Sequence, residues 1–532
     1  MRRRPLLLSG LATLTAGGAK AQSALGTSQK HFPAVSARNF QAAALDDKIG
    51  PGYSRLVIAR WGDMLQPDAP PFTPGALTTR QADNQFPYDA VIAALVSPPP
   101  SQDGIARLVL VTANPTAPAR MLFPGGIDNA AVAGREQGVS IVNLQYLSGR
   151  WMTVVGGYQT RRLSDGTLCQ LSGPAAGQVG ATVQGVLAVN GGSATPWGNV
   201  LLAEGDAGPW LSRLAGIGYG YGDPAQGARY GWVVELNPLD PGFIPVKRTG
   251  LGRIARAGVL ATATKDGRPV VFFTQDAAAG MLFRFVATTN TNDGTTLDSG
   301  TLSVAILGGD GIDWVDLGND VPTLAGLADA GSNAGGETFD APAGLALTAD
   351  GATLYLACGG NKARSVSDSL NPRGGNDDGH IVQFTLPGGD PAAKHFPARL
   401  ALIAGNPASG AGTQYGPGSQ AWLRKPRTLA IDPAGNLWIG TDQQGDTSQT
   451  ADGLFIMQTT GPAQGAVAYA YLAPKGAAAG GAAFDANSKT AFGAVRHPGA
   501  TPGARFEHPA TRWPTLQPGM PPQTTIIGLV TQ

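Results

Sequence analysis

A degenerate hairpin repeat is the sequence feature that most restricts the fold. Pro342–Cys358 (PAGLALTADGATLYLAC) and Pro426–Asp442 (PRTLAIDPAGNLWIGTD) each read as a Pro-x-x-Leu-Ala strand, a turn around glycine and a second apolar strand. Gly258–Asp276 and Gly480–Val495 are weaker copies. Such hairpins cannot bury both faces alone, but hairpins packed radially protect their edges by repetition. The pattern predicts an all-β fold, a β-propeller with long loops between its blades.

The composition agrees with many short strands joined by turns. Glycine and proline number 76 and 41 among 532 residues, and charged residues make up 14 %, against about 25 % in an average protein. These values exclude a coiled coil or a large helical bundle, and an apolar fraction of 42 % excludes wholesale disorder. A pair of β-sandwiches is the alternative. Strand-like runs continue evenly without a linker, however, which favours one large domain.

The charge balance and the cysteines exclude several classes of function. The chain has 38 Lys and Arg against 37 Asp and Glu, a net charge of +1, and no basic stripe, so we expect no nucleic-acid partner. Its two cysteines, Cys169 and Cys358, are too few for a disulfide framework or a four-thiolate zinc site. Cys169 lies between apolar residues and is predicted to be a buried thiol. The spacing leaves open whether the two cysteines pair.

The N-terminus has the pattern of a signal peptide. Arg2–Arg4 form a basic start, Leu6–Leu8 open a short apolar stretch, and Ala19–Ala21 is a small-x-small cleavage site. The Arg-Arg pair predicts the twin-arginine export machinery, with the general secretory route as the alternative. No segment is long and apolar enough to span a membrane. We therefore expect a signal peptide over residues 1–21, an N-terminal extension over 22–50, one propeller domain over 51–532, and a periplasmic or secreted protein.

Several strings, in the same order along the chain, resemble the PhoX-type alkaline phosphatases. They are Gln137–Gly177, Thr195–Asp206 with its Thr-Pro-Trp-Gly motif, Arg229–Arg253, Asn371–Ala393 and the His-Pro-Gly string in Val495–Ala500. The resemblance covers nearly all of the chain after the signal peptide. It implies a β-propeller of six blades, export by the twin-arginine route, and hydrolysis of phosphomonoesters at a central cluster of iron and calcium ions.

The resemblance also implies where the metal ligands should lie, and most of those positions have changed. The family's Cys-Glu-Glu string falls on Ala203, Glu204 and Gly205. Its Asp-Arg-Pro-Glu string falls on Asp340 to Ala343, its His-Glu pair on Arg256 and Ala257, and a later Pro-Asp pair on Pro426 and Arg427. A ring of carboxylates without cations would repel itself, so these replacements are mutually consistent with a site that no longer holds the cluster.

Four residues are the candidates for a remaining site. Glu204 and Asp340 are predicted as residual cation ligands, with a hydrogen-bonding role at a strand end or turn as the alternative for each. Arg256 and Arg427 would convert a cation pocket into an anion pocket. No residue can be assigned as catalytic from the sequence. Asn376–Asp378, His380 and His497 are expected to have structural roles.

Three functions follow from these residues. The first is an exported phosphatase-family protein whose ligand set is largely lost, so that turnover of a phosphomonoester is very weak or absent. The second is a non-catalytic periplasmic propeller that binds a small ligand, such as a phosphoester or another anion, or a protein partner. The third is a single-cation hydrolase such as a calcium-dependent lactonase. An iron–calcium cluster would support the first, no metal the second, and a single calcium the third.

Overall fold

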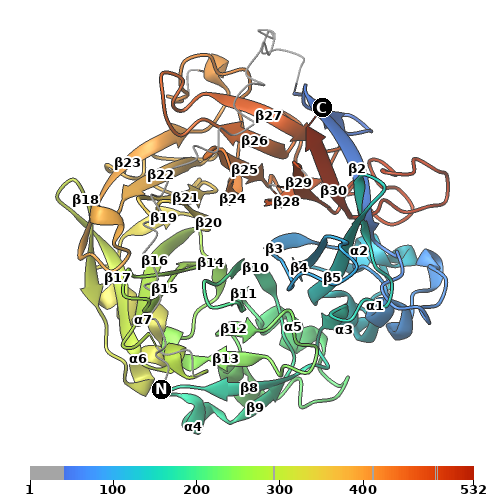
Figure 1. The fold of residues 1–532 in the computed structure, drawn as a ribbon, viewed down its shortest axis with the longest axis horizontal. Coiled ribbons are helices and arrows are strands. Elements are labelled where there is room, and N and C mark those ends of the chain that lie inside the picture. Colours follow the sequence, from blue (N-terminus) through green and yellow to red (C-terminus); the bar gives the residue numbers. More distant parts are fainter. Residues whose placement is uncertain (1–40, 291–293, 410–411, 486, 488, 532) are drawn as a thin grey trace, which may run out of the picture.

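The computed structural model describes residues 41–290, 294–409, 412–485, 487 and 489–531. Its strands radiate from a central axis, down which Figure 1 looks. The strands nearest the axis are β3 (Val91–Val96), β10 (Val189–Ala194), β14 (Arg256–Ala263), β20 (Pro342–Leu347), β24 (Pro426–Ile431) and β28 (Ala478–Asp485). Each inner strand contacts the next, and β28 contacts β3, so the ring closes. The predicted propeller fold is confirmed.

Each inner strand begins a group of strands that extends outward, and the pairing is antiparallel throughout except between β13 and β8, which are parallel. β3 is followed by β4 (Arg107–Asn114), β5 (Gly138–Leu147), β6 (Arg150–Thr153) and β7 (Arg161–Leu163), and β10 by β11 (Val200–Glu204), β12 (Val233–Leu236), β13 (Val246–Arg248), β8 (Leu168–Ser172) and β9 (Thr182–Gln184). β14 is followed by β15 (Pro269–Gln275), β16 (Ala279–Ala287), β17 (Gly300–Gly308) and β18 (Gly311–Asp316), with β19 (Thr338–Asp340) beside β16.

The remaining groups follow the same plan. β20 is followed by β21 (Thr353–Cys358), β22 (His380–Thr385) and β23 (His395–Ile403), and β23 pairs with β18 of the preceding group. β24 is followed by β25 (Leu437–Thr441), β26 (Gly453–Met457), β27 (Val467–Leu472) and β1 (Lys48–Ile49), and β28 by β29 (Thr490–Arg496), β30 (Thr525–Thr531) and β2 (Tyr53–Arg60). The four predicted repeat hairpins are the innermost strand pairs of four groups, β14–β15, β20–β21, β24–β25 and β28–β29.

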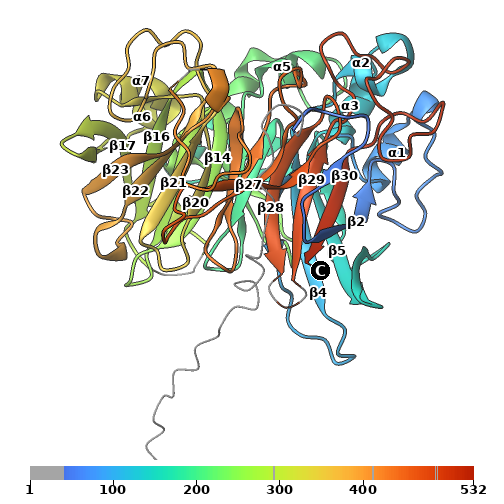
Figure 2. The same ribbon diagram turned by 90° about the horizontal axis from the view of Figure 1, so that it is seen from above.

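Short helices lie in the connections, and Figure 2 shows most α-helices toward one side of the ring. The α-helices are α1 (Thr79–Asn84), α2 (Ala119–Leu122), α3 (Ala130–Glu136), α4 (Ala176–Val179), α5 (Gly208–Arg213), α6 (Val321–Ala325) and α7 (Leu327–Asn333). The 3₁₀ turns are Pro74–Ala76, Pro124–Gly126, Pro224–Arg229, Thr249–Leu251, Thr296–Asp298, Pro387–Gly389 and Pro407–Ser409. In the part of the chain described, no helix is long and apolar enough to cross a membrane.

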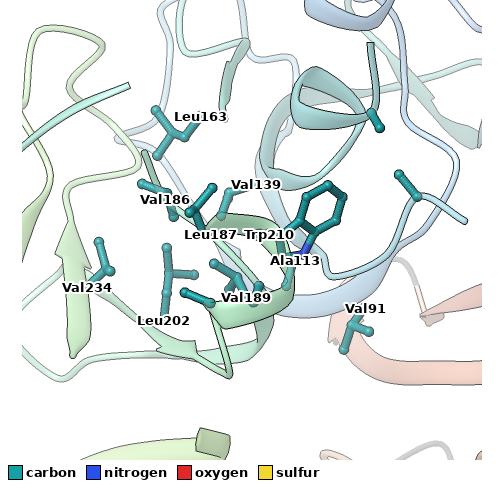
Figure 3. Packing of buried hydrophobic residues seen from close by; sticks show 14 of the residues in the cluster. Val91, Ala113, Val139, Leu163, Val186, Leu187, Val189, Leu202, Trp210 and Val234 are labelled. Carbon is teal, nitrogen blue, oxygen red and sulfur yellow. The ribbon is translucent and has the colours of Figure 1, made fainter. Parts of the chain in front are cut away.

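The hydrophobic core consists of clusters between neighbouring groups of strands. Figure 3 shows the cluster between the β3 and β10 groups, where Val139 lies beside Val186 and Leu187. Because both faces of each group are covered by its neighbours, many strands are apolar throughout and do not alternate. Strand β4, for example, is buried at every residue after Arg107. Continuous apolar runs of this kind produced the strand predictions in the sequence.

The two ends of the described chain meet in one group of strands. β2 pairs antiparallel with β30, from Tyr53 opposite Thr531 to Arg60 opposite Thr525. Part of the expected extension over 22–50 also packs onto the ring: β1 pairs with β27, and the Gln41 side chain exchanges two hydrogen bonds with the backbone of Trp422, at 2.6 and 3.0 Å. The predicted signal peptide, residues 1–21, lies outside the described residues.

Candidate functional site

A cavity of about 210 Å³ lies at the centre of the ring. It is bounded by five of the six inner strands, by the segments that follow β4 and β25, and by Arg496 at the end of β29. Its lining residues are Val91, Ile92, Pro115, Thr116, Asn190–Gly192, Ala257–Val259, Gly344, Leu345, Arg427–Leu429, Asp442, Gln444 and Arg496. Of the four predicted site residues, Arg427 alone is among them.

A β-bulge near the start of every inner strand shapes this cavity. In each of the six inner strands the pairing register shifts by one residue against its neighbour. In β10, β14 and β24 the extra residue is Asn190, Ala257 or Arg427, and all three line the cavity. A bulge leaves one residue outside the ladder and redirects its side chain. The bulges therefore determine which side chains reach the centre.

Glycine keeps the inner strands close together. A Cβ atom on Gly258 would lie 2.4 Å from the carbonyl oxygen of Ala343, and one on Gly344 would lie 2.7 Å from that of Arg427. Such separations are well inside van der Waals contact, so no larger residue fits without moving a strand. Parts of the cavity wall are consequently backbone, and few side chains can reach the cavity.

Arg496 is the centre of the main ion-pair network on the cavity wall. Its Nε and one terminal nitrogen donate to the two carboxylate oxygens of Asp89, at 2.9 and 3.0 Å, and its other terminal nitrogen donates to Asp442 at 2.7 Å. Burial by itself would raise the pKa of Asp89 and of Asp442, but Arg496 outweighs it and both pKa values lie below the ordinary value. Both carboxylates are therefore ionised at neutral pH.

The Arg427 guanidinium has fewer and more distant ion-pair partners than that of Arg496. Its one ion pair among the described residues is with Asp276, at 3.5 Å, and the two side chains are 30 % and 35 % exposed. The other Asp276 oxygen accepts from the Asn190 amide at 3.1 Å. Arg427 thus presents a guanidinium with unused donors beside the cavity, which is the group that binds carboxylate or phosphate oxygens most readily.

The Glu204 carboxylate is fully occupied by groups of the chain itself. It ends β11 and is completely buried, as is its partner Lys247 in β13, whose Nζ lies 2.7 Å from Oε1. The backbone N–H groups of Leu187 and Gly231 also donate to it, at 3.1 and 2.9 Å. The Lys247 ammonium lies 4.1 Å from the centre of the Tyr230 ring, a further favourable contact for a desolvated cation.

Asp340 has an equivalent arrangement at the end of β19. It is buried, its Oδ1 accepts a close hydrogen bond from the Arg364 guanidinium, and its Oδ2 accepts from the Asn376 amide at 2.8 Å. The same amide contacts Nδ1 of His380 at 2.9 Å. Burial lowers the pKa of His380 to about 3, so this imidazole is neutral at physiological pH.

Arg256 does not reach the cavity, although it begins an inner strand. Its guanidinium is buried and donates to the carbonyl oxygens of Gly231, Leu251, Gly252 and Ile254, and it lies 4.5 Å from the centre of the Phe273 ring. Burial lowers its pKa to about 9. Its neighbour Ala257, the bulged residue, is the one that faces the centre. With its donors bound to four carbonyl groups, Arg256 has little left for an anion.

The residues at the centre do not fit an iron–calcium cluster. Across the described ranges, no group of three or more His, Cys, Asp or Glu side chains is placed to hold a metal ion. Three buried carboxylates and the partly exposed Asp442 already face a cation of the chain: Lys247 at Glu204, Arg364 at Asp340, and Arg496 at Asp89 and Asp442. A metal ion would have to displace these side chains.

Other residues that the sequence singled out have ordinary partners. Asp377 and Asp378 form ion pairs with Arg424 and Lys425 in the connection between groups. Cys169 and Cys358 are both free and buried, which confirms the prediction of a buried thiol for Cys169.

Lys247, Asp89, Asp442 and Arg496 were not among the residues predicted from the sequence. Asp442 ends the Pro426–Asp442 string and Arg496 directly follows the Gly480–Val495 string, so a check for charged residues at strand ends would have found them.

Comparison with known proteins places the chain in a family. A family model described as alkaline phosphatase PhoX matches residues 41–499. The chain belongs to the PhoX family. The structure of Pseudomonas fluorescens PhoX in complex with vanadate, described as a transition state analogue, matches with a TM-score of 0.82 and 25 % identity, covering 94 % of this chain and 98 % of that one.

Other solved structures are far less similar. A gluconolactonase of Xanthomonas campestris has a TM-score of 0.30 at 12 % identity, over 83 % of this chain and 97 % of its own. A Trichoderma reesei protein of family AA12 has 0.34 at 12 %, over 80 % and 100 %. No curated protein matches significantly by sequence.

Proposed function

We propose that this PhoX-family protein binds a small anionic molecule in its central cavity through Arg427 and does not hydrolyse phosphomonoesters at a metal cluster. The proposal is carried by Arg427, which keeps unused donors while four carboxylates are paired with cationic side chains: Glu204, Asp340, Asp89 and Asp442. Family membership supports a phosphatase ancestry. A phosphatase of this kind needs hard anionic ligands for its metals, and those positions hold Arg, Ala, Gly or paired carboxylates.

The claim that the protein has no catalytic metal cluster is tested on the purified full-length protein. We expect no stoichiometric iron or calcium by elemental analysis, and no turnover of p-nitrophenyl phosphate when Ca²⁺ and iron are added. Turnover that chelators abolish and that Glu204→Gln also abolishes would contradict the proposal. The Arg80→Gln variant is the matched control, because Arg80 lies on the surface in an exposed pair with Asp68.

The claim that Arg427 binds an anion in the cavity is tested by calorimetric titration with propionate. We expect binding to the unmodified protein and to Arg80→Gln, and a loss of roughly tenfold or more in Arg427→Gln, because a hydrogen bond to a charged group is worth about 1.5–3 kcal/mol. Equal binding by all three proteins would assign the anion to another place. The thermal unfolding temperature of each variant shows whether it is folded.

We further propose that the protein is exported by the twin-arginine route to the periplasm. The support is the basic, apolar and small-x-small pattern of residues 1–21, together with membership of a family whose resemblance implies this route. Replacing Arg3 and Arg4 with lysine should retain the full-length precursor in the cytoplasmic fraction. Normal export of that variant would instead favour the general secretory route.

A further inference from the structure

The central cavity carries charges of both signs within a small volume. The Arg496 charge is already balanced, because its guanidinium donates three hydrogen bonds to the two carboxylates Asp89 and Asp442. Arg427 contributes a guanidinium with one long ion pair. Asp442 also lines the cavity, and Asp276 flanks it through its hydrogen bond with Asn190. The positive and the negative groups therefore belong to different residues, and both can still form hydrogen bonds or ion pairs with a ligand.

The Asp442 carboxylate can accept a further hydrogen bond, although each of its oxygens already accepts one. One accepts from the Gln444 backbone N–H at 2.8 Å and the other from Arg496 at 2.7 Å. An ionised carboxylate has about four lone-pair sites, so two hydrogen bonds leave room for a further donor. Asp276 is in a similar position, with one amide donor at 3.1 Å and one distant guanidinium. The low pKa of Asp442 keeps it charged over the physiological range.

These charges discriminate against a ligand of a single sign. A dianion such as a phosphate monoester would gain contact with Arg427 but would face the Asp442 and Asp276 carboxylates in a partly desolvated site. A simple amine would face the Arg427 guanidinium. A molecule with both a carboxylate and an ammonium group meets a partner for each. The cavity, at about 210 Å³, is smaller than the ~300–1,000 Å³ of sites for drug-sized ligands, so the molecule must also be small.

We propose that the central cavity binds a small zwitterion of the α-amino acid type, with its carboxylate on Arg427 and its ammonium group toward Asp442 and Asp276. This inference rests on the proposed function, since it names the class of molecule whose carboxylate Arg427 receives. The bulges in β10 and β24 place Asn190 and Arg427 at this cavity, and Asn190 in turn holds Asp276. The arrangement differs from a phosphate site, in which positive groups outnumber negative ones.

The test uses the full-length protein and four probes of similar size: L-alanine, propionate, ethylamine and inorganic phosphate. We expect alanine, or another of the twenty standard amino acids, to bind roughly ten- to a hundredfold more tightly than propionate or ethylamine in calorimetric titrations. Arg427→Gln should weaken both alanine and propionate. Asp276→Asn and Asp442→Asn should weaken alanine toward the affinity of propionate and leave propionate unchanged or tighter.

The controls separate failure of this inference from failure of the proposed function. Asp68→Asn and Arg80→Gln alter an exposed ion pair and should leave all affinities unchanged. If propionate or phosphate binds as tightly as any amino acid and Arg427→Gln abolishes that binding, the proposed function stands and the zwitterion is refuted. If no amino acid and no anion binds, both are refuted. Because Asp442 also pairs with Arg496, Asp276→Asn is the deciding variant when Asp442→Asn unfolds at a lower temperature.

Discussion

Replacing Lys247 with methionine tests whether a lysine has taken the place of a metal ion at Glu204. Both side chains are completely buried and 2.7 Å apart. The variant keeps the volume of the lysine stem but leaves a desolvated carboxylate whose remaining donors are the Leu187 and Gly231 backbone N–H groups. Removing one partner of a buried ion pair costs about 3–5 kcal/mol. We therefore expect a large loss of stability from a residue that does not line the central cavity.

The loss converts into a measurable shift of the unfolding temperature. Residues 41–531 make a ring of about 490 residues, and an unfolding entropy of about 2.1 cal/mol/K per residue gives on the order of 1 kcal/mol/K. A cost of about 3–5 kcal/mol then lowers Tm by about 3–5 °C, measured by scanning calorimetry.

Two further variants make this prediction decisive. Glu204→Gln combined with Lys247→Met removes both charges, and its Tm should return to within about 1 °C of the unmodified protein, since an uncharged pair needs no counterion. Lys394→Met removes a lysine from the exposed pair with Asp316 and should lower Tm by less than about 1 °C. If Lys247→Met costs no more than Lys394→Met, or the double variant is the least stable, the idea of an internal counterion is incorrect.

Three other outcomes follow from the same structure. Arg364→Met leaves buried Asp340 with only the Asn376 amide and should also lower Tm by about 3–5 °C, with Arg80→Met as the surface control. Burial, and next the nearby Asp442, raises the pKa of Asp452 to about 7, whereas the unfolded chain has about 3.9. The folded state therefore holds more protons between pH 4 and pH 7, and stability falls as pH rises through that window. Asp452→Asn, which cannot ionise, should match the unmodified protein near pH 4 and exceed it by up to about 4 kcal/mol at pH 8, measured by chemical unfolding; a constant difference across pH would disprove the assignment. Burial raises the pKa of Cys169 to about 12, and Cys358 is equally buried, so a thiol reagent should label neither in the native protein and both after denaturation without reductant.

The fold could be predicted because its strongest determinants are local. The repeat hairpins depend on apolar runs and a glycine turn within some twenty residues, and they recur as the inner strand pairs β20–β21 and β24–β25. The pairing of β2 with β30 joins residues more than 460 positions apart, and no local pattern indicates it. The same is true of Gln41, which lay in a segment without periodicity but bonds to Trp422.

The site was only partly accessible from the sequence for the same reason. Glu204 and Asp340 were predicted to lie beside a cation, but their counter-charges, Lys247 and Arg364, come from other strands and loops. Arg256 and Arg427 occupy similar positions in sequence, at the start of an inner strand. The bulge falls one residue after Arg256 and on Arg427 itself, so only Arg427 lines the cavity. A bulge depends on how two strands pair, which one sequence cannot specify.

The meeting of β2 with β30 has a consequence for how the protein is made. Strand β30 lies between β29 and β2, so this group of the ring stays incomplete until Thr525–Thr531 have left the ribosome. During synthesis β2 keeps an unpaired edge until β30, which lies more than 460 residues later in the sequence, has been made. A stop codon just before Thr525 would therefore leave two open edges at once, and such edges invite pairing with other chains. We expect that short truncation to produce aggregated protein instead of a ring with one strand fewer.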